Sequence, residues 1–184
     1  MSDATNLSIW ERLRSERMYR SRVFEVLRDT AVSPRTGREH EFHVLECSDW
    51  VNVVPVTTDD RVVLIRQFRH GIRDFSLEVP GGLIDPEDPS PMEAGRREMR
   101  EETGYDSDDL VSLGWSHPNP ALQGNRCHTF LARGVRKVGE PKLDGTEETE
   151  VVLVSRGELP ELVRSGRITH ALVVVAVYLL GLER

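Results

Sequence analysis

The sequence has few cysteines and fewer basic than acidic side chains, and both shortages exclude classes of function. Its two cysteines, Cys47 and Cys127, form no CxxC pair, which argues against a disulfide framework and against a zinc site. This usage predicts reduced thiols in the cytoplasm. With 24 lysines and arginines against 31 acids, the net charge is −7, so nonspecific binding to nucleic acid or to an anionic membrane is not expected.

Long apolar runs are also missing. The longest covers residues 171–182, well short of the roughly 20 residues that a membrane span needs, and it predicts a buried helix. The N-terminal segment lacks the basic residues and apolar run of a signal peptide. A chain of 184 residues predicts one globular domain with a small appendage.

The first 48 residues favour strands. Residues 19–27 alternate as a strand does, although residues 8–21 could instead begin a helix. A turn is expected at 35–38, before a strand at 40–45. Further strands are expected at 50–56, 61–68, 110–115, 127–132 and 151–154, and helices at 158–165 and 169–182, the latter capped by Thr169.

One stretch carries clear helix boundaries. Ser90 can cap a helix, Pro91 suits its first position and Glu93 completes a capping box. Gly104 then stands where a left-handed C-terminal residue is favoured. The sequence therefore predicts a helix from Pro91 to Thr103.

This helix carries clustered acids. Glu98, Glu101 and Glu102 stand at i, i+3 and i+4, so three carboxylates share one side of it. Each like-charged pair costs about 0.2–0.5 kcal/mol in an isolated helix. A solvated face laced with neighbouring arginines is the ordinary explanation. The alternative is a site for a hard cation such as Mg²⁺, which prefers carboxylate oxygens and completes its shell with phosphates.

The surrounding pattern resembles the box of the Nudix hydrolase family, a glycine leading to R-E-x-x-E-E-x-G and an apolar residue. The matching positions are Gly82, Arg97, Glu98, Glu101, Glu102, Gly104 and Tyr105. Arg97 comes one residue later after Gly82 than in the family pattern. The family's first glutamate position therefore falls on Pro89, and either Glu87 or Asp88 could take its role.

The resemblance implies an α+β fold, the Nudix α/β/α sandwich with a mixed sheet over residues 49–184. Residues 1–48 resemble the N-terminal β extension of the ADP-ribose and nucleotide-sugar branch, which commonly takes part in forming a homodimer. Pro120, 16 residues beyond Gly104, also matches that branch.

The implied activity is Mg²⁺-dependent hydrolysis of the diphosphate bond of a nucleoside diphosphate sugar, with Mn²⁺ as a substitute. The products are a nucleoside monophosphate and a sugar phosphate. Two alternatives stay open: another nucleotide substrate, such as a dinucleoside polyphosphate, or a domain that senses nucleotide sugars without cleaving them. The intact row of three glutamates argues against the sensor.

The resemblance also implies roles for individual residues. The metal ligands would be Glu98, Glu101 and Glu102, with a backbone carbonyl near Gly82. Arg97 would orient these carboxylates. The acidic loop 140–150 occupies the place of the family's mobile glutamate, so Glu147, with Glu148 as the alternative, would be the general base or a further metal ligand.

Four more residues are candidates for substrate binding. Arg69 and Glu78 match the arginine and the glutamate that line the substrate cleft in the branch that this chain resembles, and Arg73 is charged among the same apolar residues just before the box. A surface ion pair is the other explanation. Trp50 opens a strand after a polar pair, and it either stacks on a nucleobase or is a half-buried core residue.

Overall fold

The first three strands form an antiparallel sheet of their own. The structure is a computed structural model that describes residues 7–143, 145 and 148–183. The sheet has the order β1-β2-β3, built from β1 (Glu11–Arg20), β2 (Glu25–Val32) and β3 (Glu39–Glu46). It belongs to one compact unit, Met1–Ser48 with Asn119–Asn125, while Asp49–Pro118 and Arg126–Arg184 form a second.

The strand predicted at 19–27 and the alternative helix over 8–21 are both wrong. β1 ends at Arg20, and Ser21 reverses the chain: its hydroxyl accepts from the backbone N–H of Phe24 and donates to the carbonyl of the same residue. β1 then pairs with β2, and the two strands are joined by ion pairs such as Arg17 with Glu25. The alternating charges of this segment thus form cross-strand pairs, which local periodicity did not separate from a helical face.

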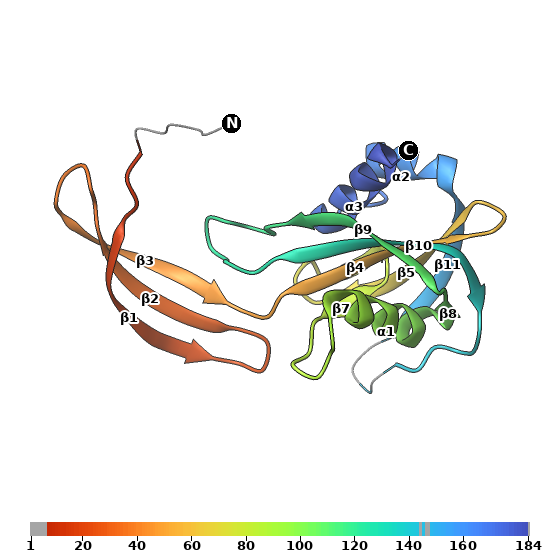
Figure 1. Cartoon of the computed structure of the whole chain (residues 1–184), viewed down its shortest axis with the longest axis horizontal. Coiled ribbons are helices and arrows are strands. Elements are labelled where there is room, and N and C mark those ends of the chain that lie inside the picture. Colours follow the sequence, from red (N-terminus) through yellow and green to blue (C-terminus); the bar gives the residue numbers. More distant parts are fainter. Residues whose placement is uncertain (1–6, 144, 146–147, 184) are drawn as a thin grey trace. The chain divides into compact units, whose positions relative to one another are not determined.

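The second unit is built on a mixed sheet of eight strands (Figure 1). β4 and β10 are parallel, and the other pairs are antiparallel. The predicted strands of this unit are confirmed, and β6, β7 and β8 are additional. The main path has the order β11-β5-β4-β10-β8, made of β4 (Trp50–Thr57), β5 (Arg61–Arg69), β8 (Tyr105–Asp106), β10 (Cys127–Lys137) and β11 (Thr149–Ser155), while β6 (Asp74–Glu78) pairs with β5, β7 (Gly81–Leu83) with β4 and β9 (Asp109–Ser116) with β10.

The sheet splits where the candidate site lies. β4 and β5 pair at Val56 and Val62, then separate, so that β6 continues beside β5 and β7 beside β4. The carbonyl of Pro80, between β6 and β7, accepts a hydrogen bond from the backbone N–H of Val53 at 2.9 Å. The split therefore fixes the backbone of the glycine pair that follows Pro80 against β4.

Helices cover both faces of this sheet and make the predicted α/β/α sandwich. α1 (Pro91–Thr103) lies on one face, with the bounds that its sequence predicts, while α2 (Leu159–Arg164) and α3 (Ala171–Leu182) lie on the other (Figure 1). The predicted cap of α3 at Thr169 is wrong: the helix begins at Ala171, with His170 at the N-cap position. No helix in the described part of the chain is long and apolar enough to cross a bilayer.

Two apolar cores follow from the alternation along β4. Val54 and Val56 pack with residues of α2 and α3, while Val51 and Val53 pack with residues of α1. α1 approaches β4 closely at Gly95, where a Cβ atom would lie 2.9 Å from methyl groups of both Val51 and Val53. A glycine at this position thus lets the acidic helix lie directly on the sheet.

Candidate active site

Local contacts fix both ends of α1 and therefore the direction of its acidic face. The Ser90 hydroxyl accepts from the backbone N–H of Glu93 at 3.2 Å. At the other end Gly104 has a φ of 72°, and its N–H donates to the Arg100 carbonyl at 2.9 Å. A Cβ atom on Gly104 would lie 2.2 Å from the Gly139 carbonyl oxygen, so a larger residue would displace the neighbouring segment.

The three glutamates of α1 differ in burial, and two of them contact β7. Glu102 is buried, and its Oε2 accepts the backbone N–H of Gly81 at 2.8 Å. Glu98 stands against Gly82, where a Cβ atom would come within 2.5 Å of its Oε1. Glu101 is the most exposed, with 44% of its side chain accessible. The two glycines therefore let the β7 backbone lie against the carboxylates predicted to bind metal.

The carboxylates suit a hard cation that keeps part of its water. Within the described ranges, no three His, Cys, Asp or Glu side chains are grouped closely enough to cage an ion. Mg²⁺ does not need such a cage, because it is usually bound by one or two carboxylates, several waters and substrate phosphates. The donor set of Glu98, Glu101 and Glu102, beside a backbone kept bare by Gly82, fits that chemistry.

Arg97 connects the acidic face to the loop before α1. Its Nη1 donates to Glu98 at 2.9 Å and to Glu101 at 3.1 Å. Its Nε and Nη2 bind the two carboxylate oxygens of Asp88 at 3.1 and 2.9 Å, and Nη2 also reaches the Leu83 carbonyl. Of the two acids that the sequence left open, Asp88 rather than Glu87 is the one that binds Arg97, which fits the orienting role expected of Arg97.

The charges of this network stabilise one another. The hydrogen bonds from Arg97 hold the pKa of the Asp88 carboxyl below its ordinary value, against the effect of burial. In turn, the hydrogen bonds from Asp88 raise the pKa of Arg97 despite its partial burial. Asp88 also accepts the backbone N–H of Asp85 at 2.9 Å, which closes the inserted turn. Glu87, at the outside of that turn, is exposed.

A second network joins Arg69, Glu78 and His170. Glu78 is 2% exposed and accepts two hydrogen bonds from Arg69, at 2.9 Å from Nε and 2.8 Å from Nη2. His170 Nδ1 lies 3.2 Å from Glu78 Oε2. Burial alone would raise the pKa of Glu78, but the contacts with Arg69 and His170 outweigh it and leave the pKa well below its ordinary value. Arg69 and Glu78 therefore form an ion pair with each other, as the alternative explanation had it, but Glu78 is buried rather than at the surface.

Sequence reasoning missed His170. Its position just before an apolar run places it at the start of α3, but its contact with Glu78 joins residues that are distant in the chain. No local pattern signals such a contact.

The loop predicted to carry the general base is tied to α1 on both sides. The backbone N–H of Lys142 donates to the Glu101 carbonyl at 2.7 Å, and the Thr149 hydroxyl donates to the Glu102 carbonyl at 3.2 Å. Glu147 lies outside the described residues, and Glu148 is exposed. The described ends of the loop therefore lie at the helix turn that carries the metal-binding candidates.

The other two predicted substrate residues also lie on the second unit. Trp50 is half-buried at the start of β4, paired with Leu83 of β7 and Cys127 of β10, and its backbone N–H donates to the Arg126 carbonyl at 2.7 Å. Arg73 is exposed in the turn between β5 and β6, with a φ of 56°. Neither position assigns a role.

A groove borders the acidic face. It has a volume of about 410 Å³ and lies between α1 and residues 138–142. Its charged lining is mixed, with the basic residues Arg96, Arg97, Arg100 and Lys142 and the acidic residues Glu93, Glu101 and Glu140. Arg96 and Arg97 are already bound by carboxylates, so the groove carries little uncompensated positive charge.

Comparisons with known proteins agree with this geometry. A model of the NUDIX domain matches residues 48–172. The chain is 23% identical to the methanol dehydrogenase activator of Bacillus methanolicus over 172 residues, 93% of this chain and 92% of that one. It is 25% identical to the ADP-ribose pyrophosphatase of Bacillus subtilis (strain 168) over 169 residues, 91% and 90% of the two chains. The crystal structure of an ADP compounds hydrolase matches with a TM-score of 0.84 and 25% identity, covering 97% of this chain and 95% of that one.

Proposed function

Because the chain belongs to the NUDIX family, we propose that it hydrolyses the diphosphate bond of a nucleoside diphosphate sugar, ADP-ribose or another ADP-sugar first. The products are a nucleoside monophosphate and a sugar phosphate. The divalent cation is Mg²⁺, with Mn²⁺ as a substitute. The observation that carries this proposal is the row of Glu98, Glu101 and Glu102, held by Arg97 and Gly81 against β7.

The chain's own residues hold the reacting groups. A divalent cation on the glutamates would polarise a phosphoryl oxygen, offset the negative charge of the diphosphate and activate a water. Arg97 fixes the direction of Glu98 and Glu101, so that the carboxylates do not have to reorganise as charge develops.

The bond change needs a base. The oxygen of a water forms a bond to one phosphorus while the bond from that phosphorus to the bridging oxygen breaks. The second phosphate leaves with the bridging oxygen. Glu147, or Glu148 as the alternative, takes the proton of the water. The tethers at Lys142 and Thr149 support this role, because they keep the loop beside the turn of α1 that carries Glu101 and Glu102.

Substrate binding is assigned to Arg69. Arg69 has 44% of its side chain exposed while Glu78 holds its guanidinium from the buried side. Glu78 thus positions the Arg69 guanidinium, and its carboxylate also offers a hydrogen-bond acceptor to the substrate. Trp50 and Arg73 stay predicted substrate contacts, on the grounds given by the sequence.

The first unit supports the proposal of a homodimer. All ten residues of β1 are exposed, and the three-stranded sheet carries exposed large apolar side chains. Among these are Leu13, Met18 and Phe42, and the ring of the exposed Trp10, just before β1, is in edge contact with that of Phe42 at 5.4 Å. Exposed apolar patches on soluble proteins mark interaction surfaces, and a second copy of the chain is the partner that the sequence predicts.

The location in the cytoplasm also stays a prediction from cysteine usage.

Hydrolysis is tested with a panel of ADP-ribose, other ADP-sugars, UDP-sugars and dinucleoside polyphosphates, each with Mg²⁺ and an added phosphatase that releases phosphate from the products. ADP-ribose or an ADP-sugar should give the highest kcat/KM, and chelation of Mg²⁺ should abolish release. Tight binding of these compounds without any turnover would instead identify a sensor, and preference for a dinucleoside polyphosphate would identify the other alternative.

A further inference from the structure

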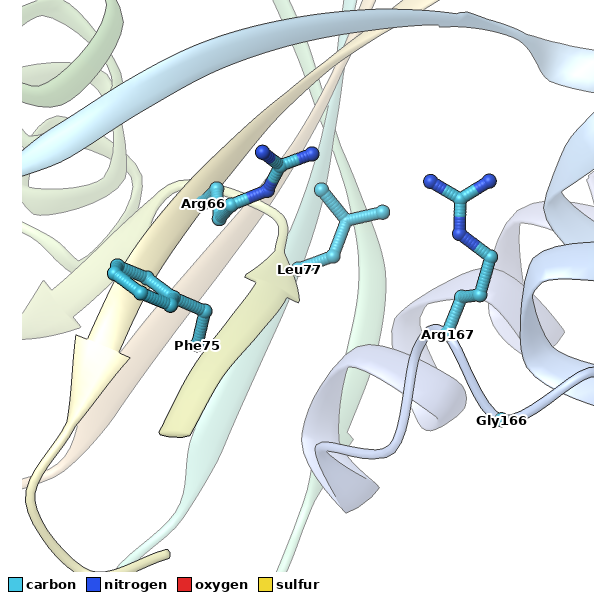
Figure 2. A pocket seen from close by; sticks show the side chains of 5 residues that line it. All are labelled: Arg66, Phe75, Leu77, Gly166 and Arg167. Atoms are coloured by element: carbon cyan, nitrogen blue, oxygen red, sulfur yellow. The ribbon is translucent and has the colours of Figure 1, made fainter. Parts of the chain in front are cut away.

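A hollow separate from the carboxylates of α1 opens on the opposite face of the main sheet. It has a volume of about 320 Å³ and is lined by Arg66, Phe75, Leu77, Gly166 and Arg167 (Figure 2). Arg66 and Leu77 are direct cross-strand partners on β5 and β6, and Leu77 packs into the core formed with α2 and α3. Because α1 packs on the other core, this hollow lies on the other side of the sheet from the carboxylates predicted to bind metal.

The hollow carries more positive than negative charge. Figure 2 shows the guanidinium groups of Arg66 and Arg167 on either side of Leu77. Arg66 Nη1 donates to Glu150 at 2.9 Å. Arg167 follows Gly166, whose φ of 72° turns the chain after α2, and no carboxylate in the described part of the chain pairs with its side chain. Two guanidinium groups with one carboxylate partner, in a chain of net charge −7, make a local site for an anion.

An exposed aromatic ring stands beside these charges. Phe75 is 66% exposed, and its ring lies edge-on to that of Phe68, its partner across the strands, with 5.8 Å between the centroids. Flat rings such as nucleobases stack on exposed aromatic side chains. Guanidinium groups favour phosphate oxygens. The volume lies at the lower end of the range of about 300–1,000 Å³ for small-molecule sites.

We propose that this hollow binds a nucleoside monophosphate, with the phosphate on Arg66 and Arg167 and the base against Phe75. The proposed reaction releases such a compound, so an occupied hollow would let the product act on the enzyme away from the metal. That consequence rests on the proposed function, whereas binding itself does not.

The location is tested by NMR on the full chain with labelled phenylalanine. The sequence has five phenylalanines, so few ring signals have to be distinguished, and Phe75→Leu identifies that of Phe75. AMP is added in the presence of EDTA and without substrate, so that neither metal nor turnover contributes. As AMP is added, the Phe75 ring signal should shift until binding is saturated. The Phe68 ring signal should shift less. An unchanged Phe75 signal under AMP concentrations that saturate binding elsewhere would overturn the proposal.

The charge requirement is tested with two arginine variants. Arg167→Gln should weaken AMP binding about tenfold or more, the equivalent of one lost charge-assisted hydrogen bond. Arg164→Gln is the matched control, because Arg164 lies on α2, is 71% exposed and pairs with Glu161 outside the hollow. It removes the same charge and should change the dissociation constant by less than about twofold. Equal losses in both variants would show a general charge effect and refute the site.

The ligand class is tested with adenosine and inorganic phosphate. Each lacks one half of the proposed contacts and should bind more weakly than AMP by about tenfold or more. Adenosine binding as tightly as AMP would refute the role of the arginines. Arg167→Gln should also leave kcat/KM for ADP-ribose unchanged at low AMP. A loss of kcat/KM by orders of magnitude would place the hollow in the active site instead. If the wild type hydrolyses none of the panel, the proposed function fails while the binding test keeps its meaning.

Discussion

Replacement of Asp88 by asparagine tests whether the inserted turn anchors the acidic face of α1. Asp88 holds Arg97 through two hydrogen bonds of 3.1 and 2.9 Å, and Arg97 in turn holds Glu98 and Glu101. Asparagine keeps the shape and one acceptor oxygen but presents an NH₂ group to a guanidinium that also donates. We therefore expect Arg97 to lose part of its anchor and the carboxylates to lose part of their alignment.

The magnitude follows from burial and charge. A hydrogen bond to a charged group contributes about 1.5–3 kcal/mol, and one of two bonds survives the substitution. The side chains of Asp88 and Arg97 are 9% and 30% exposed, so water recovers part of the loss. The expected cost is about 1–2 kcal/mol, and each kcal/mol lowers Tm by about 2–4 °C in a chain of this size. Mutation of residues that orient metal ligands typically lowers metal affinity or activity by about 10–100-fold. We expect a rise of the same size in the Mg²⁺ concentration needed for half-maximal activity.

The assay is a Mg²⁺ titration of hydrolysis, together with thermal unfolding in EDTA. Glu87→Gln is the matched control, because it removes the same charge from the neighbouring, exposed position. It should leave Tm and the Mg²⁺ requirement close to wild type. If the two variants behave alike, Asp88 is not the anchor of Arg97 and the account of the inserted turn is refuted.

The pH dependence has a definite sign. The pKa of Asp88 is lowered in the folded protein, so its contribution is present above the ordinary carboxyl pKa of about 3.9 and is lost as the pH falls through the folded value. The difference in Tm between wild type and Asp88→Asn should therefore be constant at neutral pH and shrink below about pH 4. A difference that grows on acidification would contradict the charged pair.

Three further predictions use other parts of the structure. Glu102→Gln should keep the fold and lose activity by orders of magnitude, as measured by hydrolysis at saturating Mg²⁺; a rate near wild type would refute the metal assignment. Arg69→Gln removes the two guanidinium hydrogen bonds to the buried Glu78 and should lower the free energy of unfolding in urea by at least about 2 kcal/mol. Arg66→Gln, whose partner Glu150 is 65% exposed, should lower it by less than about 1 kcal/mol. Equal losses would contradict the burial argument. Sedimentation of the full chain should give about twice the subunit mass of 20.9 kDa, and a fully active monomer at micromolar concentration would refute the dimer.

The sequence by itself determined the helix that carries the candidate metal ligands. Ser90, Pro91 and Gly104 act on backbone groups within one turn of the chain, so the bounds of α1 follow from local chemistry. The helical period then places Glu98 and Glu102 on one side without any knowledge of the rest of the fold. Most strands of the main sheet were predictable for the same reason, because their apolar runs are bounded by turn residues.

Only the tertiary structure decided the contacts between distant segments. Nothing local separates Glu87 from Asp88, and the choice depends on which carboxylate the Arg97 guanidinium reaches after the turn has folded. His170 meets Glu78 because α3 packs against the split sheet. Residues 11–20 became a strand because β2 supplied partners for their charges. Periodicity describes one segment at a time, whereas hydrogen bonds and ion pairs between segments depend on how the chain brings them together.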